Sequence, residues 1–168
     1  MDFKELAALR YSCRKLSDRK VDEAIVQKLL EIQRLAPSAY NKQPQRIYLL
    51  EGSEVAEVLS RVTGEEFSAS LFMVVCYDRE ESWKRPFDDF DEGLMDSVIA
   101  ACHLDLAITE AGLGTYWFTS FDPVVLSQAL DLPEHHFPMV VFPVGYPADE
   151  ERSSSDRKPL SEQVIDRR

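Results

Sequence analysis

The chain carries in its middle the unbroken apolar run Leu71-Phe72-Met73-Val74-Val75-Cys76-Tyr77. An apolar run of this length is typical of a strand that is covered by other elements on both of its faces. We therefore expect this strand to lie centrally in a sheet, with the rest of the chain arranged around it.

Shorter apolar segments on both sides of this run predict the other elements. Further strands are predicted at residues 46–50, 115–119 and 136–144. Helices are predicted at residues 3–9, 22–35, 53–62, 91–111, 123–130 and 160–165. Asp22 and Asp122 can cap two of these helices, whereas Pro37 and Gly112 are expected to end two. Because strands and helices do not alternate strictly, we predict an α+β fold with a mixed sheet flanked by helices, and not a Rossmann unit.

Length and charge restrict the class of protein. The 168 residues fit one domain spanning residues 1–168, with a charged and Ser-rich tail from about residue 150 to residue 168. The formal net charge of −11 argues against nucleic acid or an anionic membrane as a partner, since both require basic surfaces. No apolar run approaches the roughly 20 residues of a membrane span.

The N-terminus and the cysteines favour a cytoplasmic protein. The sequence Met-Asp-Phe-Lys-Glu lacks the basic and then apolar pattern of a signal peptide. Cys13, Cys76 and Cys102 are odd in number and far apart, which predicts neither a disulfide framework nor a zinc site. A reducing compartment is therefore expected.

A cationic segment near the N-terminus stands out against the acidic balance. Arg10-Tyr11-Ser12-Cys13-Arg14-Lys15 places three cations and a hydroxyl within six residues. Guanidinium groups bind phosphate oxygens with paired hydrogen bonds, and a serine adds a rotatable donor. The segment is therefore either a site for one small anion or a solvated charge run after a helix.

Two polar turns are further candidates. They are Ala36-Pro37-Ser38-Ala39-Tyr40-Asn41-Lys42-Gln43-Pro44 and Gly112-Leu113-Gly114-Thr115. Taken alone, the first fits ordinary turn chemistry as well as a ligand loop, and the second fits a helix end followed by a strand. The second is a poor dinucleotide fingerprint because it lacks a third glycine and follows a helix.

Few reactive side chains are arranged for catalysis. No His, Cys and carboxylate cluster has metal-ligand spacing, and no Gly-x-Ser-x-Gly or Walker motif is present. His103 is expected in the core or an interface, and His135 and His136 are expected to point to opposite faces of an extended chain. Cys13 has no evident base partner. This pattern is typical of proteins in which a cofactor supplies the chemistry.

The predicted helix at residues 91–111 is apolar nearly all round. Such a helix is buried on several sides, either inside the core or against another subunit.

Taken together, the motifs resemble the FMN-dependent nitroreductase family. Arg-x-Ser-x-Arg, Ala-Pro-Ser-x-x-Asn-x-Gln-Pro and Gly-Leu-Gly-Thr occur in that order, and Gly-Tyr-Pro and Arg-Lys-Pro-Leu follow at residues 145–147 and 157–160. The resemblance extends from about Leu6 to Val164. It implies a homodimer with two FMN sites, in which the apolar helix is the interface.

The resemblance also implies the residues that bind the cofactor. The first segment would hold the FMN phosphate, the second would come from the partner subunit, the third would pass beside the ring, and the last would return cations to the phosphate. The implied cofactor-binding residues are Arg10, Tyr11, Ser12, Arg14, Pro37, Ser38, Ala39, Asn41, Gln43, Leu113, Gly114, Thr115, Arg157 and Lys158. None is implied as a catalytic group; Arg14, or Lys15, would act electrostatically on the flavin. No metal site is expected.

The implied activity is that of an NAD(P)H oxidoreductase. NADH or NADPH would reduce FMN at N5 and leave, and a small-molecule oxidant such as a nitroaromatic, a quinone or another conjugated electrophile would then use the same face in a ping-pong cycle. The segment Glu80–Phe90 would form a wall that selects acceptors. A specialised flavoenzyme, a flavin-binding module without reductase activity and a flavin-free interaction protein remain alternatives.

Two positions depart from the family pattern. Relatives usually carry a second arginine where this chain has Tyr11 and a tryptophan where it has Gln45. The first departure is expected to weaken phosphate binding by about 1–3 kcal/mol. The second departure concerns the substrate side of the site, so the pattern does not identify the electron acceptor.

Overall fold

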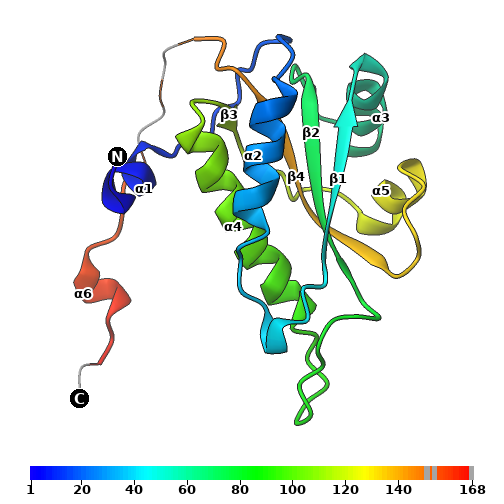
Figure 1. The fold of residues 1–168 in the computed structure, drawn as a ribbon, viewed down its shortest axis with the longest axis vertical. Helices are drawn as coiled ribbons and strands as arrows, with labels where there is room; N and C mark the ends of the chain where they lie inside the picture. The colour runs from blue at the N-terminus through cyan, green and yellow to red at the C-terminus, as the bar shows by residue number, and fades with distance from the viewer. Residues whose placement is uncertain (150–151, 153–154, 167–168) are drawn as a thin grey trace.

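A four-stranded sheet forms the middle layer of the computed structural model, which describes residues 1–149, 152 and 155–166 (Figure 1). Its strands are β1 (Gln45–Glu51), β2 (Leu71–Asp78), β3 (Gly114–Thr115) and β4 (His136–Gly145), in the order β1-β2-β4-β3. The predicted central strand is confirmed, because β2 lies between β1 and β4 and all its residues are buried.

The prediction of a mixed sheet is wrong for the described residues. The pairings of β1 with β2, of β2 with β4 and of β3 with β4 are all antiparallel. A continuous apolar run reports that both faces of a strand are buried, but it carries no information about the direction of the neighbouring strands. The rest of the α+β prediction is confirmed.

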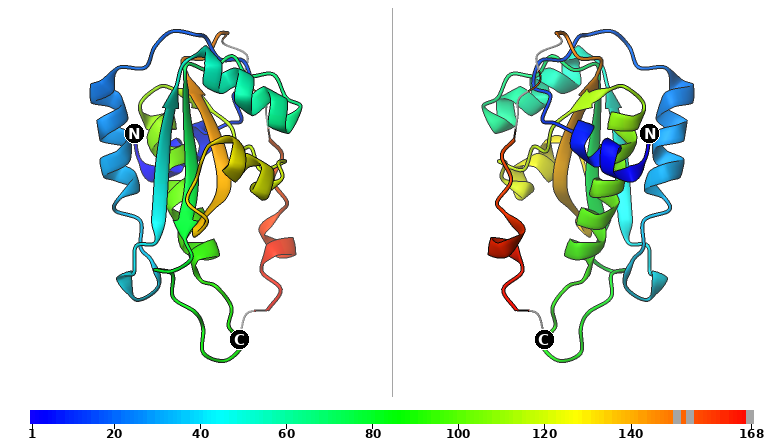
Figure 2. Two further views of the ribbon diagram at one scale, coloured as in Figure 1. Left: turned by 90° about the vertical axis from the view of Figure 1, so that its right-hand side faces the viewer. Right: turned by 90° about the vertical axis from the view of Figure 1, so that its left-hand side faces the viewer.

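Helices cover both faces of the sheet (Figure 2). The helices α2 (Glu23–Gln33) and α4 (Gly93–Glu110) lie on one face, and α3 (Ser53–Thr63) and α5 (Pro123–Ala129) lie on the other. One core cluster joins α2 and α4 to the sheet through residues such as Leu29, Leu104 and Phe142. A second cluster joins α3 and α5 to the opposite face through Leu59, Leu126 and Phe72.

Local signals set most element boundaries as expected. The Asp22 carboxylate accepts the Ala24 amide at the start of α2, and the Asp122 carboxylate accepts the Val124 amide at the start of α5. Gly112 follows α4 with a φ of 73°, a conformation that favours glycine. The strand predicted at residues 115–119 is interrupted: β3 ends at Thr115, and only Phe118 pairs again, with Val141 of β4.

The two ends of the chain lie outside these layers. Helix α1 (Phe3–Leu9) has no buried residue and packs beside α4. Helix α6 (Leu160–Gln163) confirms the predicted final helix, and residues 155–166 are all exposed in a segment that extends away from the body (Figure 1). Residues 150, 151, 153, 154, 167 and 168 of the predicted tail lie outside the described residues. Among the helices that are described, none combines the length and apolarity needed to cross a membrane.

Candidate functional site

The cationic segment at residues 10–15 runs alongside β3. The Cys13 amide donates to the Thr115 carbonyl over 2.8 Å. A Cβ atom placed on Gly114 would lie 2.7 Å from Cys13 Sγ and 2.8 Å from a methyl group of Leu16, so the missing side chain of Gly114 makes room for this segment. The fold therefore brings two of the predicted groups together: Arg10, Tyr11, Ser12 and Arg14 with Leu113, Gly114 and Thr115.

The two arginines of this segment contact different groups. Arg10 Nη1 lies 3.8 Å from Oδ2 of Asp105, and the Arg14 guanidinium lies 5.5 Å from the centre of the Tyr116 ring. Asp105 is buried in α4 and also accepts the Trp117 indole N–H over 2.7 Å. Burial raises the pKa of Asp105, while Trp117 and Arg10 oppose that rise. A buried carboxylate that is ion-paired in this way holds Arg10 beside the end of β3.

Tyr11 brings no charge to the segment. Its hydrogen bond with Cys13, together with burial, raises the pKa of the Tyr11 phenol to about 12, so the phenol is neutral at neutral pH. The guanidinium of Arg152 lies 5.5 Å from the Tyr11 ring, and Lys15 forms an ion pair of 2.9 Å with Asp149. The cations at this edge are therefore Arg10, which is paired with Asp105, and Arg14, with Lys15 and Arg152 close by.

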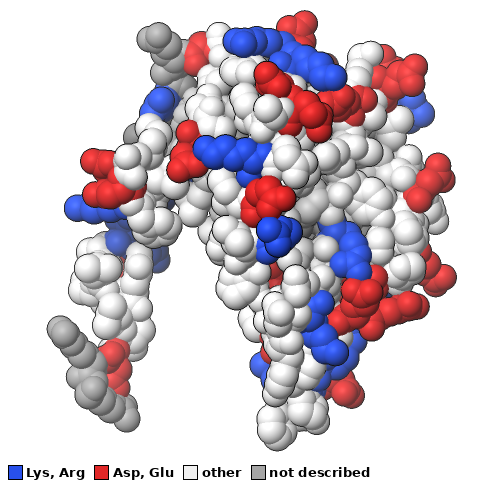
Figure 3. Space-filling model, in the orientation of Figure 1, with Lys and Arg blue, Asp and Glu red and all other residues white. Residues whose placement is uncertain are grey.

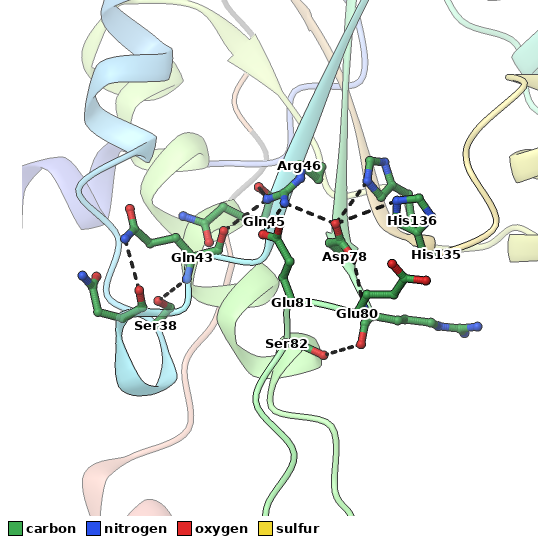
Figure 4. Close-up of polar contacts among 12 residues, drawn as sticks. Ser38, Gln43, Gln45, Arg46, Asp78, Glu80, Glu81, Ser82, His135 and His136 are labelled. Atoms are coloured by element: carbon green, nitrogen blue, oxygen red, sulfur yellow. Dashed lines mark hydrogen bonds and ion pairs between the residues drawn. The ribbon is translucent and has the colours of Figure 1, made fainter.

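The second predicted group lies at the other end of α4. The Ala39 amide donates to Oδ1 of Asp96 over 2.8 Å, near the start of that helix. The Gln43 amide donates to Ser38 Oγ over 2.9 Å, and the Gln43 side chain donates to the Asn41 carbonyl over 3.1 Å (Figure 4). Together with Pro37, these residues form an ordered polar loop around a short 3₁₀ turn at Ala39–Asn41.

Within a single chain, the polar loop and the cationic segment do not meet. The loop is tied to Asp96 and the segment to Asp105, and at 1.5 Å per helical residue these anchors are about 14 Å apart along α4. Arg157 and Lys158 also lie apart from the cationic segment: both are exposed, Arg157 donates to the Asp156 carbonyl, and Lys158 pairs with Glu162.

The cleft beside the cationic segment is too small for a flavin by itself. It has a volume of about 70 Å³ and is lined by Leu9, Tyr11, Thr109, Gly112, Leu113, Gly114, Thr115, Pro147 and Arg152. Sites for organic cofactors usually enclose roughly 300–1,000 Å³. The donor set fits FMN, because guanidinium and hydroxyl groups suit a phosphate and amide side chains suit a flavin edge. The residues around this cleft therefore enclose only part of a site of that size.

An apolar surface lies between the two groups. A groove of about 650 Å³ runs between α1, α2 and α4, with Phe3, Leu6, Ile32 and Ile99 among its lining residues. Met95 and Val98 of α4 are 48% and 45% exposed. The predicted apolar helix therefore packs one side into the core and leaves another uncovered. In Figure 3 the edge of the body that faces α6 is mostly without charged groups.

The predicted wall segment Glu80–Phe90 lies next to the polar loop. Trp83 packs on Tyr40 with ring centres 4.8 Å apart, while Phe87 is 92% exposed. Lys84 and Asp91 form an isolated bridge, and the Arg85 amide donates to the Phe90 carbonyl. Contacts of this kind close a hairpin-like loop that composition alone did not indicate.

The sequence pattern did not indicate Asp96 and Asp105, the carboxylates that contact the polar loop and the cationic segment. Their position in an otherwise apolar helix could have identified them, because a buried aspartate almost always has a hydrogen-bond or ion-pair partner. Their partners, Ala39 and Arg10, are distant in the sequence and only the fold identifies them.

Fold and site together define a layered α+β protein whose cationic segment lies against the edge of an antiparallel sheet. The model of the Nitroreductase family matches residues 7–75 and 68–146, and the chain belongs to that family.

Individual relatives agree with this assignment. A protein from Archaeoglobus fulgidus, provisionally named NADH dehydrogenase/NAD(P)H nitroreductase, is 31% identical over 148 residues, which cover 84% of this chain and 83% of that protein. The crystal structure of a nitroreductase family protein from Clostridium difficile 630 is 36% identical with a TM-score of 0.91, and the match covers 98% of this chain and 97% of that one. A Desulfovibrio desulfuricans protein solved in complex with FMN shares the fold at 24% identity, with a TM-score of 0.87 and coverage of 98% and 96%.

Proposed function

We propose that this chain is an FMN-dependent oxidoreductase that takes electrons from NADH or NADPH and passes them to nitroaromatics, quinones or related conjugated electrophiles. Membership of the Nitroreductase family supports the proposal, as does the name of the Archaeoglobus relative. The observation that carries it is the contact between the cationic segment and β3, where the Cys13 amide donates to the Thr115 carbonyl. The FMN-bound Desulfovibrio structure shows that a protein of this fold accommodates the cofactor.

In the proposed site, Arg10, Ser12 and Arg14 bind the phosphate of the cofactor. Arg10 is suited to this role because Asp105 already holds its guanidinium at the sheet edge. Arg14 adds positive charge that favours electron uptake by the ring system. Bound FMN supplies reversible two-electron transfer, which none of these side chains can perform.

A second copy of the chain completes the site in our proposal. Its polar loop, with Pro37, Ser38, Ala39, Asn41 and Gln43, would enclose the cofactor from the other side, and the uncovered face of α4 would form the interface. Two observations support a homodimer: the small cleft beside the cationic segment and the separation of the two groups along α4. Reductant and oxidant would then share one open face, and we expect ping-pong kinetics.

The first test identifies the ligand and the reaction. Protein purified without added flavin is heated, the released ligand is identified by mass spectrometry, and NADH and NADPH oxidation is measured with a quinone and with a nitroarene. We expect FMN and parallel-line initial-rate plots. A colourless protein that gains no flavin absorbance when mixed with FMN would overturn the proposal. A yellow protein inactive with every acceptor would favour the specialised flavoenzyme.

The second test concerns the phosphate. Replacing both arginines (Arg10→Ala with Arg14→Ala) removes two charged hydrogen-bond donors, each contributing about 1.5–3 kcal/mol, so FMN affinity should fall by at least about 100-fold. The matched control replaces two exposed arginines elsewhere (Arg34→Ala with Arg61→Ala) and should keep its flavin. Full flavin occupancy in the first variant would show that the phosphate binds in another place.

A further inference from the structure

Three side chains of metal-binding type meet at the end of the sheet opposite to β3. Asp78 ends β2 and His136 begins β4, and the two residues are cross-strand partners. Asp78 Oδ2 lies 3.5 Å from Nε2 of His136 and 3.9 Å from Nε2 of His135 (Figure 4). Neither the cofactor site nor the proposed interface uses this cluster.

The expectation that His135 and His136 point to opposite faces is wrong. Alternation of side chains applies within a strand, but His135 lies in the turn before β4. The turn brings both imidazoles to the same carboxylate, with ring centres 4.5 Å apart. The sequence shows no regular ligand spacing for these three residues, because Asp78 comes from a different strand.

The cluster has the donor types and dimensions of an open metal site. One donor atom from each residue lies within 4.8 Å of the other two. Metal–ligand distances of about 2.0–2.2 Å place the donors of a tetrahedral Zn²⁺ about 3.3–3.6 Å apart, so the donor atoms need to approach one another by at most about 1.5 Å. The His135 side chain is 39% exposed and has room to rotate. We propose that Asp78, His135 and His136 bind a divalent transition-metal ion such as Zn²⁺, with a fourth position open to solvent.

Neighbouring groups orient the donors. The Tyr48 hydroxyl contacts Nδ1 of His136, so Nε2 is the ring nitrogen that faces Asp78. Metal-bound histidines commonly have such a partner on the second nitrogen. The Glu80 amide donates to Oδ1 of Asp78 over 3.0 Å and fixes the carboxylate. Burial and the neighbouring His135 lower the pKa of His136, so its imidazole is neutral and able to coordinate at neutral pH.

Arg46 is the competing cation. Its Nη2 atom lies 3.2 Å from Oδ2 of Asp78, and it also pairs with Glu81 and donates to the carbonyls of Gln43 and Gln45. Burial raises the pKa of Asp78, but the Glu80 amide and the charge of Arg46 oppose that rise and the net shift is downward, so the carboxylate is ionised at neutral pH. A bound metal ion would take over Oδ2, and Arg46 would keep its other contacts.

The position of the cluster ties it to the rest of the molecule. The Asp78 amide donates to the Pro44 carbonyl over 2.8 Å, and Pro44 directly follows the polar loop. A bound ion would thus join the end of β2, the start of β4 and the base of that loop.

Titration calorimetry of the purified holoprotein with Zn²⁺ tests the proposal. We expect one ion per chain in the wild type and a loss of more than about tenfold in affinity for His135→Ala and for His136→Gln. The control is His103→Gln, which removes the remaining imidazole, half-buried on α4, and should bind Zn²⁺ as the wild type does. Unchanged affinity in both cluster variants would overturn the proposal, and so would a loss confined to His103→Gln, which would place the ion beside Cys102.

A second measurement uses the competing arginine. Arg46→Met removes the cation from Asp78, so Zn²⁺ should bind several-fold more tightly, and weaker or unchanged binding would contradict Asp78 as a shared ligand. Zn²⁺ should also raise the Tm of the wild type but not that of His135→Ala, because an ion that binds only the folded chain stabilises it. His135 is partly exposed, so its variant remains informative should His136→Gln not fold.

Discussion

Single residues carry the connections between the core of this protein and its candidate site. Asp96 and Asp105 are both buried on α4, and each has one partner in a predicted cofactor segment. Burial of a carboxylate is unfavourable unless hydrogen bonds or opposite charges compensate for lost hydration. Asp96 is compensated only in part, because Oδ1 accepts the Ala39 amide while Oδ2 has no hydrogen-bond partner among the described residues.

Stability should therefore depend on the ionisation of Asp96. Burial raises the pKa of Asp96, and the charge of Asp91 adds to the rise although the Ala39 amide opposes it. An acid whose pKa is higher in the folded state than in the unfolded state binds more protons when folded. The contribution of this carboxyl group to stability is therefore full at pH values below its pKa in the unfolded state. It is lost as the pH rises through its pKa in the folded state.

For Asp96→Asn we predict a gain in stability relative to wild type that grows from about pH 4 towards neutral pH and stays within about 1 kcal/mol. The amide oxygen of the new side chain can still accept the Ala39 N–H. Urea unfolding at pH 4.5 and pH 7.5 measures the difference. Asp131→Asn is the control, because Asp131 is exposed and its φ of 49° suits asparagine. A difference that shrinks as the pH rises would contradict the role of Asp96.

At the scale of elements, β3 is the point where the predicted phosphate segment is fitted to the sheet. The strand is only two residues long, yet Gly114 and Thr115 are both buried, and the Thr115 hydroxyl donates to the Pro143 carbonyl over 2.7 Å. The absence of a side chain at Gly114 lets Cys13 and Leu16 pack against the strand. The position of Arg10–Lys15 therefore depends on one glycine.

Gly114→Ala should displace the cationic segment. The added methyl group would meet the side chains of Cys13 and Leu16 at less than 3 Å, so we expect a loss of about 1–3 kcal/mol in stability and weaker FMN retention. Denaturant unfolding and the ratio of flavin to protein measure the two effects. Gly145→Ala is the comparison, since its nearest neighbour outside the adjacent residues, the Ser17 carbonyl, would be 3.2 Å away. Combining Gly114→Ala with Cys13→Ala should restore part of the loss, and no restoration would place the clash elsewhere.

The whole molecule presents two groups of predicted cofactor-binding residues that do not meet within one chain. The cationic segment lies near Asp105, the polar loop lies near Asp96, and the uncovered apolar face of α4 lies between them. A second copy seated on that face is the arrangement that we propose for the complete site. Dimerisation and cofactor binding should then be lost together.

Val98→Glu tests this coupling. Val98 is 45% exposed in the single chain, so a charge there should leave the fold intact but be buried and unpaired in the proposed interface. We predict a folded monomer with less than about one tenth of the wild-type flavin content, since losing 1.4 kcal/mol already costs a factor of ten. Light scattering after gel filtration and the flavin ratio measure this. Val124→Glu on α5, at a position 62% exposed, should remain dimeric and yellow. A dimeric, flavin-loaded Val98→Glu protein would place the interface elsewhere.

Many features of this protein were predictable because they depend on neighbouring residues. The buried run at β2, the caps at Asp22 and Asp122 and the helix end at Gly112 follow from residue type and local backbone preference. The ordered motifs that resemble the nitroreductase family were also present in the sequence, and the family match confirms that resemblance.

Tertiary structure decided what depends on residues that are distant in the chain. Strand direction was one such feature, because apolar continuity reports burial and not orientation. The pairing of Arg10 with Asp105 and the meeting of His135 and His136 at Asp78 were others. The sequence thus determined which elements form and which family the chain belongs to, since both rest on local patterns. Only the packing of helices against the sheet brought these charged groups together, because such contacts join positions that share no sequence period.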